Sequence, residues 1–283
     1  MNNRLQLRQI PREPVARFRE IGDLAVTCLK LEVATYPKPG LVSHVDNGAH
    51  HDMDATLLNR SAETLRPFFT DLAAAGAAGA GMDRLRAIGI AAEREMLLAT
   101  GGVNTHRGAI FGLGLLCAAA GFRETYAADH TLGALIAQVW GHDILAGPQP
   151  LRSHGAEAGR RYGVGGARME AAQGLPAVYD IALPALRAAR TIAAGDEEAA
   201  RVQACLQLIA QVADTNMLHR GGSEGLAFAQ GEAEAFLAQG GIAAADWRDN
   251  AMAIHRAFTA RNLSPGGCAD LLAMALFVER LEL

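Results

Sequence analysis

Four stretches far apart in the chain combine glycine with Asn, His, Asp, Lys or Arg at expected helix ends: YPKPGLVSHVDNGAHHDMD (36–54), GVNTHRGAIFGLG (102–114), DTNMLHRGG (214–222) and NLSPGGCADLL (262–272). Such residues weaken helices, so their concentration at these points calls for a functional reason. The N–H groups and the positive dipole end at a helix N-terminus favour anions. The pattern predicts one site that is built from several helix termini and binds an anionic, phosphorylated ligand.

The first stretch offers a fixed cation followed by hard oxygen ligands. Lys38 stands between two prolines, which stiffen the backbone and so fix where its ammonium group projects. Asp46, His50, Asp52 and Asp54 follow, and these residues suit a Mg²⁺ ion carried by a nucleotide, although magnesium usually takes only one or two protein carboxylates. The alternative is an Asx-turn in which Asp52 caps the next helix.

The second stretch places polar groups at a helix start. Asn104 and Thr105 are suitable N-caps, and His106 with Arg107 would add two donors for an anion held by the first turn. A capped, close-packed helix with a solvated Arg107 explains the same residues without a ligand. This motif alone does not decide between the two interpretations.

The last two stretches are open to the same alternatives. Asp214 is expected at the end of a helix, with His219 and Arg220 just before a double glycine, an arrangement that could bind an anion or form an ordinary C-cap. Asp270 is expected one turn into a helix that begins with two glycines, where negative charge is favourable in any case.

A fifth stretch, RRYGVGGARMEAAQGLP (160–176), only superficially resembles a glycine-rich phosphate loop. No strand is expected before it, which argues against a dinucleotide-binding fold. Arg168 and Glu170 stay candidates because glycines flank them on both sides. GxSxG and HExxH motifs are absent from the sequence. Three isolated histidines are expected to be structural or solvated: His130, His142 and His255.

Helices must position all of these stretches. Apolar residues recur at three- and four-residue steps almost everywhere, β-branched residues are sparse and alanine is abundant. The sequence predicts an all-α protein: one globular domain over residues 1–283, with residues 1–14 as a loosely ordered extension and the site built from interhelical loops and helix N-termini. About eleven helices are expected, with boundary errors of about two to four residues: 15–34, 53–76, 82–100, 105–121, 129–145, 153–172, 177–194, 196–213, 223–238, 244–260 and 266–281.

Composition limits the classes of function. Half of the residues are hydrophobic but only 5% are aromatic, so the core should consist of closely approaching helices. A net charge of −4 leaves no basic excess for nucleic acid. Four single cysteines without a CxxC pair indicate reduced core residues, and no signal peptide or long apolar run is found. We expect a soluble, cytoplasmic protein that binds neither nucleic acid nor membrane, and the sequence leaves a homo-oligomer open.

Five motifs in order resemble the triphosphoribosyl-dephospho-CoA synthase family: EVATYPKPGLVSHVDNGAHHDMD, GVNTHRGAIFGLGLL, YGVGGARMEAAQGLP, DTNMLHRGG and NLSPGGCADLLAMA. The likeness extends from about residue 20 to about residue 280 and favours the malonate decarboxylase branch over the citrate lyase branch. Met169, Leu175 and Cys268 depart from the family pattern without removing a charged group.

This resemblance implies an enzyme that transfers the 5-triphosphoribosyl group of ATP to the 2′-hydroxyl of 3′-dephospho-CoA and releases adenine. The product would be the prosthetic-group precursor that a transferase attaches to an acyl carrier protein. Breaking the N-glycosidic bond gives C1′ of the ribose oxocarbenium character, and a carboxylate takes the proton of the attacking hydroxyl. Direct attack on β-linked ATP gives an α-linked product, so one base suffices.

The resemblance also suggests a role for each candidate. Glu32, Glu170 and Asp214 are the alternatives for the catalytic base, and the sequence cannot rank them. Asp52 and Asp270 are the expected contacts of Mg²⁺ that enters with ATP. Residues expected to bind substrate or phosphate are Lys38, Asn104, His106, Arg107, Arg168, His219 and Arg220.

Two other functions stay open from the sequence. A Mg²⁺-dependent hydrolase of ADP-ribose-like or nucleotide substrates could use the same helices, acids and basic loops with water as the acceptor. A non-catalytic nucleotide-binding or carrier-protein-docking module would bind without turnover, but it leaves the carboxylates in the glycine-bearing loops unexplained.

Overall fold

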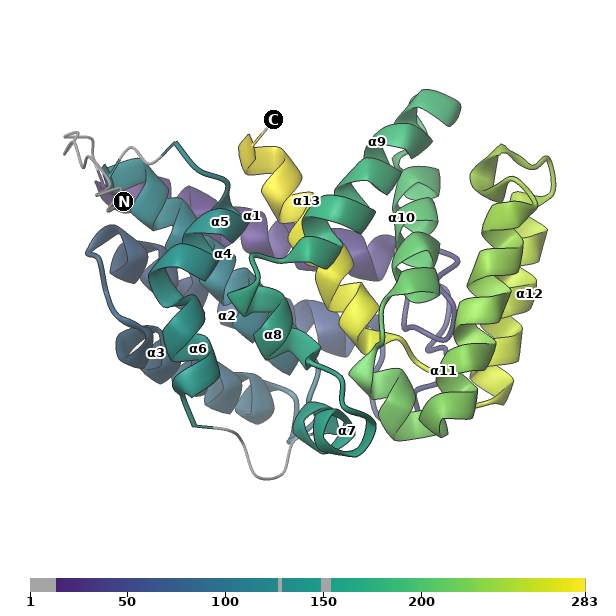
Figure 1. Cartoon of the computed structure of the whole chain (residues 1–283), viewed down its shortest axis with the longest axis horizontal. Coiled ribbons are helices and arrows are strands. Elements are labelled where there is room, and N and C mark those ends of the chain that lie inside the picture. The colour runs from purple at the N-terminus through teal and green to yellow at the C-terminus, as the bar shows by residue number, and fades with distance from the viewer. Residues whose placement is uncertain (1–13, 127–128, 149–153, 283) are drawn as a thin grey trace.

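The computed structural model describes residues 14–126, 129–148 and 154–282 (Figure 1). Within these ranges the chain forms helices and loops and no β-strand, which confirms the all-α prediction. The first half contains α1 (Pro14–Ala34), α2 (Ala55–Ala77), α3 (Met82–Ala99), α4 (Arg107–Tyr126), α5 (Leu132–Leu135), the π-helix η1 (Ile136–Trp140) and α6 (Gly141–Ala146). The second half contains α7 (His154–Tyr162), α8 (Gly166–Ala172), the π-helix η2 (Ala177–Ala182), α9 (Leu183–Ile192), α10 (Glu197–Gln211), α11 (Thr215–Ala238), the 3₁₀ helix η3 (Gly241–Ala243), α12 (Trp247–Ala260) and α13 (Gly266–Glu282).

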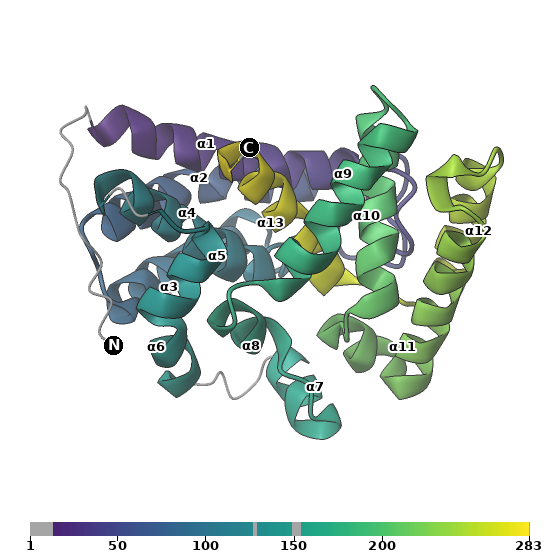
Figure 2. The same cartoon turned by 45° about the horizontal axis from the view of Figure 1, so that its top comes forward.

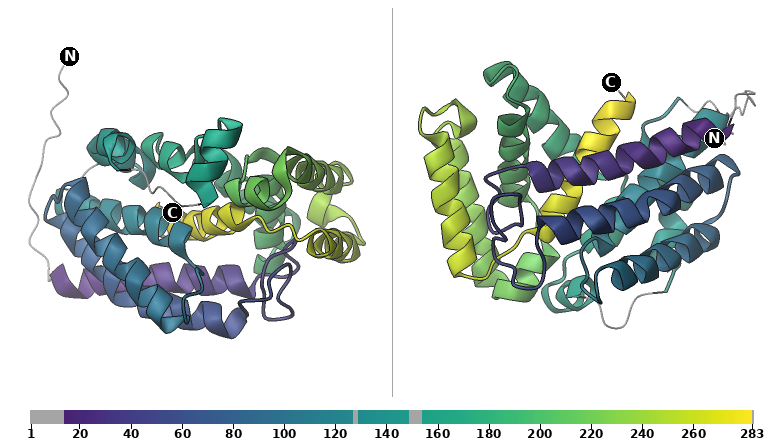
Figure 3. Two further views of the ribbon diagram at one scale, coloured as in Figure 1. Left: turned by 90° about the horizontal axis from the view of Figure 1, so that it is seen from below. Right: turned by 180° about the vertical axis from the view of Figure 1, so that it is seen from behind.

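Helix α13 forms the centre of the molecule. It lies between the group of α2 to α6 and the group of α9 to α12, and it packs against α1, α4 and α10 (Figures 1 and 2). All its residues from Leu271 to Glu279 are buried. On the opposite face α1, α2 and α3 lie side by side (Figure 3). One large cluster of buried apolar side chains draws on helices from α1 to α13, as expected for a single globular domain.

Glycines set the close crossing of α2 and α4. A Cβ atom at Gly76 would lie 1.9 Å from the carbonyl oxygen of Ala118, and one at Gly121 would lie 1.9 Å from the carbonyl oxygen of Ala73. The two helix backbones therefore touch at both points, which explains the alanine- and glycine-rich composition. The helix expected at 105–121 therefore does not end at Gly121, and α4 continues to Tyr126.

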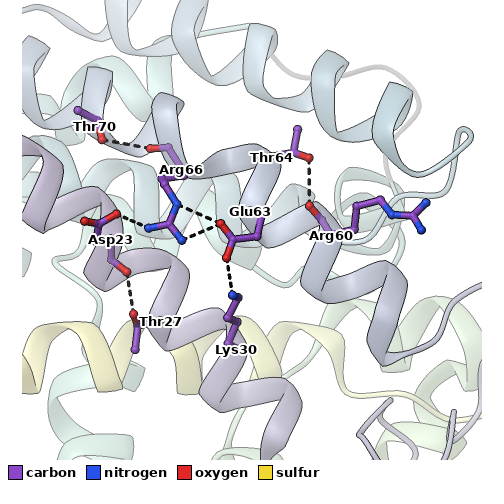
Figure 4. A network of polar contacts seen from close by, with 8 residues as sticks. All are labelled: Asp23, Thr27, Lys30, Arg60, Glu63, Thr64, Arg66 and Thr70. Atoms are coloured by element: carbon purple, nitrogen blue, oxygen red, sulfur yellow. Dashed lines mark hydrogen bonds and ion pairs between the residues drawn. The ribbon is translucent and has the colours of Figure 1, made fainter.

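A polar network on the surface joins α1 to α2 (Figure 4). Arg66 of α2 donates to Glu63 Oε2 at 3.0 and 2.7 Å and pairs with Asp23 of α1, while Lys30 of α1 pairs with Glu63. Exposed pairs of this kind contribute little to stability. They nevertheless give α1 and α2 a defined register on the outer face.

Two helix predictions differ from the structure because of glycine. The helix expected at 153–172 is two helices, α7 and α8, separated at Gly163, whose φ is 69°. The helix expected at 223–238 begins earlier, at Thr215, and kinks at Gly222, where φ is 64° and ψ is −164°. Both glycines adopt a left-handed φ that other residues rarely take.

The described residues contain no disulfide bond and no helix that could span a membrane. Cys28, Cys117, Cys205 and Cys268 are free and buried, as predicted. None of the helices in the described part of the chain combines the length and apolar character that a bilayer span requires.

Candidate active site

A cavity of about 1740 Å³ brings the polar stretches of the sequence together. Its volume exceeds the roughly 300–1,000 Å³ of a pocket for one small ligand, so it has room for two substrates. Every predicted site residue except Lys38 lines it: Glu32, Asp52, Asn104, His106, Arg107, Arg168, Glu170, Asp214, His219, Arg220 and Asp270. Helix packing thus brings together loops that are far apart in the sequence, such as those at 36–54 and 262–272, in one site.

Three carboxylates from different helices meet at one wall of the cavity. Glu32 belongs to α1, Asp214 precedes α11, and Asp270 lies in the second turn of α13. Burial, and then the negative charges of Glu32 and Asp214, hold the pKa of the Asp270 carboxyl well above its usual range, although the N–H of Ala109 lowers it. A positively charged ligand group beside these three acids would relieve the repulsion between them.

Lys38 lies outside the cavity. Its side chain is 0% exposed, and its ammonium group forms an ion pair with Glu32, whose side chain is 11% exposed. The backbone of Lys38 is also fixed, because its carbonyl oxygen lies 2.7 Å from Nδ1 of the buried His255, whose Nε2 lies 3.0 Å from Asp46. The direct phosphate contact expected of Lys38 is therefore not available in this arrangement, because the ammonium group is enclosed by protein.

Asp214 is a cap shared by two helices. It lies at the start of α11, not at the end of a helix as expected, and Oδ1 accepts hydrogen bonds from the N–H groups of Asn216 (2.7 Å) and Met217 (3.2 Å). Oδ2 accepts from the N–H of Cys268 in α13 at 2.9 Å. Burial raises the pKa of Asp214, and these three donors oppose that shift. Both carboxylate oxygens are thus committed to backbone groups.

Glu170 also accepts a backbone hydrogen bond at the start of a helix. Its Oε1 accepts a hydrogen bond from the N–H of Ala177 at the start of η2, at 2.6 Å. Burial raises the pKa of this carboxyl, the N–H of Ala177 opposes the shift, and Asp180 adds to it. Glu170 lines the cavity from α8, on a different element from the other acidic residues of the site.

His106 is a buried neutral donor. Burial lowers its pKa from 6.5 to about 4, so at neutral pH it carries no charge. Thr105 donates to Ser61 Oγ at 2.7 Å, and Ser61 Oγ lies 2.8 Å from Nδ1 of His106. When Ser61 donates to Nδ1, the imidazole carries its proton on Nε2. His106 can then offer one neutral hydrogen bond to a ligand.

The cavity-lining arginines differ in how their charge is balanced. Arg107 pairs with Glu93, with its Nε 2.7 Å from Oε1. Asn104 accepts the N–H of Arg107 at 3.2 Å and so caps α4, in agreement with the predicted N-cap. Glu93 thus already neutralises the charge of Arg107, and this ion pair reduces the attraction of Arg107 for an anionic ligand.

Arg168 and Arg220 have carbonyl partners instead. Arg168 donates to carbonyl oxygens at the end of α6 and just after it, and these belong to Ile144, Leu145 (2.9 Å), Gly147 (2.9 Å) and Pro148 (3.2 Å). Within the described ranges no carboxylate forms an ion pair with Arg168. The arginine is therefore fixed in place while its charge stays available to an anion.

Arg220 joins two of the glycine-bearing loops. It donates to the carbonyl oxygens of Ala49 (3.0 Å) and Asn262 (3.3 Å) and to Asn262 Oδ1 (2.9 Å), and it lies 3.3 Å from Nδ1 of His50. Burial lowers its pKa, and Asp52 opposes that effect at longer range. As with Arg168, no carboxylate among the described residues forms an ion pair with this guanidinium.

The predicted metal contacts are separate acidic residues. Asp52 is 61% exposed and lies 3.6 Å from Nδ1 of His50. It does not cap the following helix, because Asp54 does so by accepting the N–H of Leu57 at 2.7 Å. No three His, Cys, Asp or Glu side chains converge as a metal cage in the part of the chain that the structure describes. Magnesium bound mainly to phosphates would need only one or two of these carboxylates.

Two polar residues of the site carried no signal in the sequence. Ser61 of α2 orients His106, and Glu93 of α3 neutralises Arg107. Each acts across a long sequence separation on an ordinary helix or loop position. Only the packing of helices reveals them.

The fold and the cavity together define an all-α protein with a polar site large enough for two substrates, lined by carboxylates on one wall and by arginines elsewhere. Residues 18–283 match the sequence profile of CitG, described as ATP:dephospho-CoA triphosphoribosyl transferase. The chain belongs to this transferase family.

Curated relatives match along nearly the whole chain. A probable 2-(5''-triphosphoribosyl)-3'-dephosphocoenzyme-A synthase of Stutzerimonas stutzeri is 43% identical, over 96% of this chain and 95% of its own length. The 2-(5''-triphosphoribosyl)-3'-dephosphocoenzyme-A synthase of Pectobacterium atrosepticum is 42% identical, over 94% and 92%, and a probable synthase of Acinetobacter calcoaceticus is 38% identical, over 92% and 90%. No solved structure matches the chain.

Proposed function

We propose that this chain transfers the 5-triphosphoribosyl group of ATP to the 2′-hydroxyl of 3′-dephospho-CoA with release of adenine. The family membership supports this reaction, and the observation in the structure that carries it is the carboxylate wall of Glu32, Asp214 and Asp270 inside a cavity large enough for both substrates. Oxocarbenium character at C1′ of the ribose would be stabilised beside such a wall.

The charges of the cavity suggest where the phosphates bind. Carboxylates repel phosphate, so the triphosphate should lie away from Glu32. Arg220 is the best-placed anchor for it, because its guanidinium is held by carbonyls and lacks a bound carboxylate. Arg168 is held in the same way in α8 and is suited to the diphosphate of 3′-dephospho-CoA. His106, Asn104, Arg107 and His219 would add hydrogen bonds along the same cavity.

Magnesium is part of the proposal as a companion of ATP. The donor set fits a hard cation, because Asp52 and Asp270 offer carboxylate oxygens at the cavity without a preformed cage. Bound Mg²⁺ would neutralise part of the triphosphate charge. The neighbouring residues would then hold the ribose and exclude water.

The product is proposed to serve malonate decarboxylase as the precursor of the prosthetic group on its acyl carrier protein. General likeness of the stretches KPGLVSHVDNGAHHDMD (38–54) and DLAAAGAAGAG (71–81) supports this branch over citrate lyase. Deleting the gene and measuring whether the carrier protein of each enzyme still acquires its prosthetic group, by intact-protein mass spectrometry, would separate the two.

The reaction is tested by incubating the purified protein with ATP, Mg²⁺ and 3′-dephospho-CoA, leaving out each in turn. Adenine and the coenzyme products are followed by liquid chromatography and mass spectrometry. We expect adenine and a triphosphoribosylated coenzyme in equal amounts, and only when both substrates are present.

Other outcomes would assign the site differently. Adenine formed without 3′-dephospho-CoA would support a hydrolase, ADP or AMP would indicate phosphate chemistry, and binding without turnover would indicate a docking module. Each of these results would contradict the proposed transfer.

A further inference from the structure

Only one member of the buried ion pair of Lys38 and Glu32 lines the cavity. Glu32 lines the cavity, whereas Lys38 lies behind it and is fully enclosed. The pair links the end of α1 to the loop after it, and His255 holds the carbonyl of Lys38 from α12. The Lys38 ammonium group is enclosed and cannot contact a ligand, but it binds the carboxylate of Glu32, which lines the cavity. Any effect of Lys38 on a ligand is therefore exerted through Glu32.

Hydrogen bonding separates Glu32 from the other acidic candidates. Asp214 uses both oxygens for three backbone N–H groups that begin α11 and α13. Glu170 accepts the N–H of Ala177 at the start of η2. The Glu32 carboxylate caps no helix among the described residues, and its Oε1 accepts a hydrogen bond from the Lys38 ammonium group. Of these candidates it is the one whose carboxylate is positioned by a side chain and not consumed by backbone capping.

We propose that Glu32 is the general base of the transfer and that Lys38 is the positioning residue that holds its carboxylate at the cavity wall. This inference rests on the proposed function. The 2′-hydroxyl of 3′-dephospho-CoA gives its proton to Glu32, and its oxygen forms the bond to C1′ of the ATP ribose. The bond from C1′ to N9 breaks, and its electron pair leaves with adenine. One proton passes overall from the hydroxyl to adenine, and Glu32 returns to its ionised form.

The charges around Glu32 explain why it needs the lysine. It faces Asp270 of α13, which in turn faces Asp214 at the start of α11, and the thiol of Cys205 lies near the same group. Neighbouring acidic groups repel one another, and the Lys38 ammonium group is the cation that holds Glu32 beside them. A base at this wall therefore depends on a lysine that does not itself touch the substrate.

The first test compares Glu32→Gln with the double variant Glu32→Gln/Lys38→Met. Glu32→Gln leaves a buried ammonium group without its partner and is expected to lower both the melting temperature and kcat, the latter about 100-fold or more. The double variant removes both charges and should regain melting temperature. We expect it to bind ATP, followed by calorimetry, and still to release adenine at least about 100-fold more slowly than the unaltered protein.

The second test uses the pH dependence of Lys38→Met. Loss of the ammonium group disfavours the ionised carboxylate, so the acid limb of the profile of kcat/KM against pH should move to higher pH, with activity recovering as pH rises. A purely structural role would lower the rate by a similar factor at every pH. Lys38→Arg, which keeps a cation, should keep the acid limb near its original position if it folds.

The exposed pair Lys30 and Glu63 provides matched controls. Both side chains lie on the outer surface, away from the cavity, and form the same kind of contact between α1 and α2 (Figure 4). Lys30→Met and Glu63→Gln should keep adenine release within about twofold of the unaltered protein, because exposed pairs contribute little.

Three results would overturn the inference. The first is full recovery of activity in the double variant, and the second is an unshifted acid limb in a folded Lys38→Met. The third is that Asp214→Asn or Glu170→Gln loses turnover while it keeps ATP binding and its melting temperature, and Glu32→Gln keeps turnover. Failure of the unaltered protein to release adenine would instead contradict the proposed function, so the two failures are distinguishable.

Discussion

At the scale of single residues, the structure changes what several polar side chains can do. His106 carries no charge at neutral pH because it is buried, and Lys38 is enclosed with Glu32. Arg107 and Arg220, adjacent to similar glycines in the sequence, differ because one has a carboxylate partner and the other is held by carbonyls. The residue type alone therefore does not give the charge that a ligand meets.

The lowered pKa of His106 predicts a loss of stability in acid. The folded protein holds the neutral form, with a pKa of about 4 against 6.5, so the stability is present above pH 6.5 and is lost as pH falls toward 4. At about 1.4 kcal/mol per pKa unit, the loss amounts to about 3 kcal/mol. Urea unfolding of the unaltered protein and of His106→Gln between pH 7.5 and pH 4.5 measures it, and the variant should show a shallower dependence.

Exposed His142 is the control for this measurement. Its side chain is 92% exposed, so His142→Gln should leave the pH dependence of stability unchanged. An equal slope for His106→Gln and the unaltered protein would show that His106 is not responsible.

The balance of charge predicts that Arg220 matters more than Arg107 for ATP. Arg220→Met should raise the KM for ATP about 10- to 100-fold, the range that corresponds to losing a charge-assisted hydrogen bond worth about 1.5–3 kcal/mol. Arg107→Met should raise it less than about fivefold, because Glu93 already neutralises this guanidinium. Steady-state kinetics and melting temperatures of both variants decide the point, and the reverse order of effects would refute it.

At the scale of elements, helix starts and close helix crossings build the site. Asp214 accepts hydrogen bonds from N–H groups at the N-termini of both α11 and α13, and the backbones of α2 and α4 are in contact at glycines. These contacts place Asp270 and His106 at the same cavity, since Asp270 lies on α13 and His106 immediately precedes α4. The polar residues are therefore positioned by caps and by small residues as much as by the apolar core.

Asp214→Ala should destabilise the protein by about 3 kcal/mol or more, because it leaves three backbone N–H groups without an acceptor at about 1 kcal/mol or more each. Asp196 is the comparison, since it caps one helix, α10, by accepting the N–H of Ala199 at 2.9 Å, and its pair with Arg248 is exposed and contributes little. Asp196→Ala should cost about 1 kcal/mol, the usual loss of one N-cap. Denaturant unfolding of the two variants tests the difference, and equal losses would contradict the shared-cap interpretation.

Gly76→Ala should also destabilise the protein, by about 2 kcal/mol or more, because the added Cβ meets the backbone of α4. Gly231→Ala in α11 is the control, since nothing lies within 4 Å of the added atom. That change should be neutral or stabilising by up to about 1 kcal/mol. A neutral Gly76→Ala would show that α2 and α4 can separate without loss.

At the scale of the whole molecule, the cavity joins α1, the α1–α2 loop and the starts of α4, α11 and α13. Its volume of about 1740 Å³ is large enough for two substrates, and the proposed single displacement requires both to bind at once. We expect initial rates at varied concentrations of both substrates to give intersecting double-reciprocal lines. Parallel lines would instead indicate a covalent intermediate and a ping-pong mechanism.

The helical class could be predicted from the sequence, and the four polar stretches picked out there line one cavity in the structure. Helical periodicity and abundant alanine are local properties, so the helices were predicted to within a few residues at most ends. Glycines with special geometry were harder, because Gly121 mediates helix contact while Gly222 bends a helix that continues. A glycine has the same appearance in the sequence whether it stops, bends or packs a helix.

The roles of the individual polar residues depend on tertiary contacts and could not be predicted from the sequence. Whether an acid caps a helix, pairs with a buried lysine or faces a ligand depends on neighbours that are distant in sequence, as Asp214, Glu32 and Asp52 show. The same holds for Ser61 and Glu93, which no motif marks. Burial and electrostatic balance are properties of the packed chain, and they set the charge, orientation and access of each group once the helices have met.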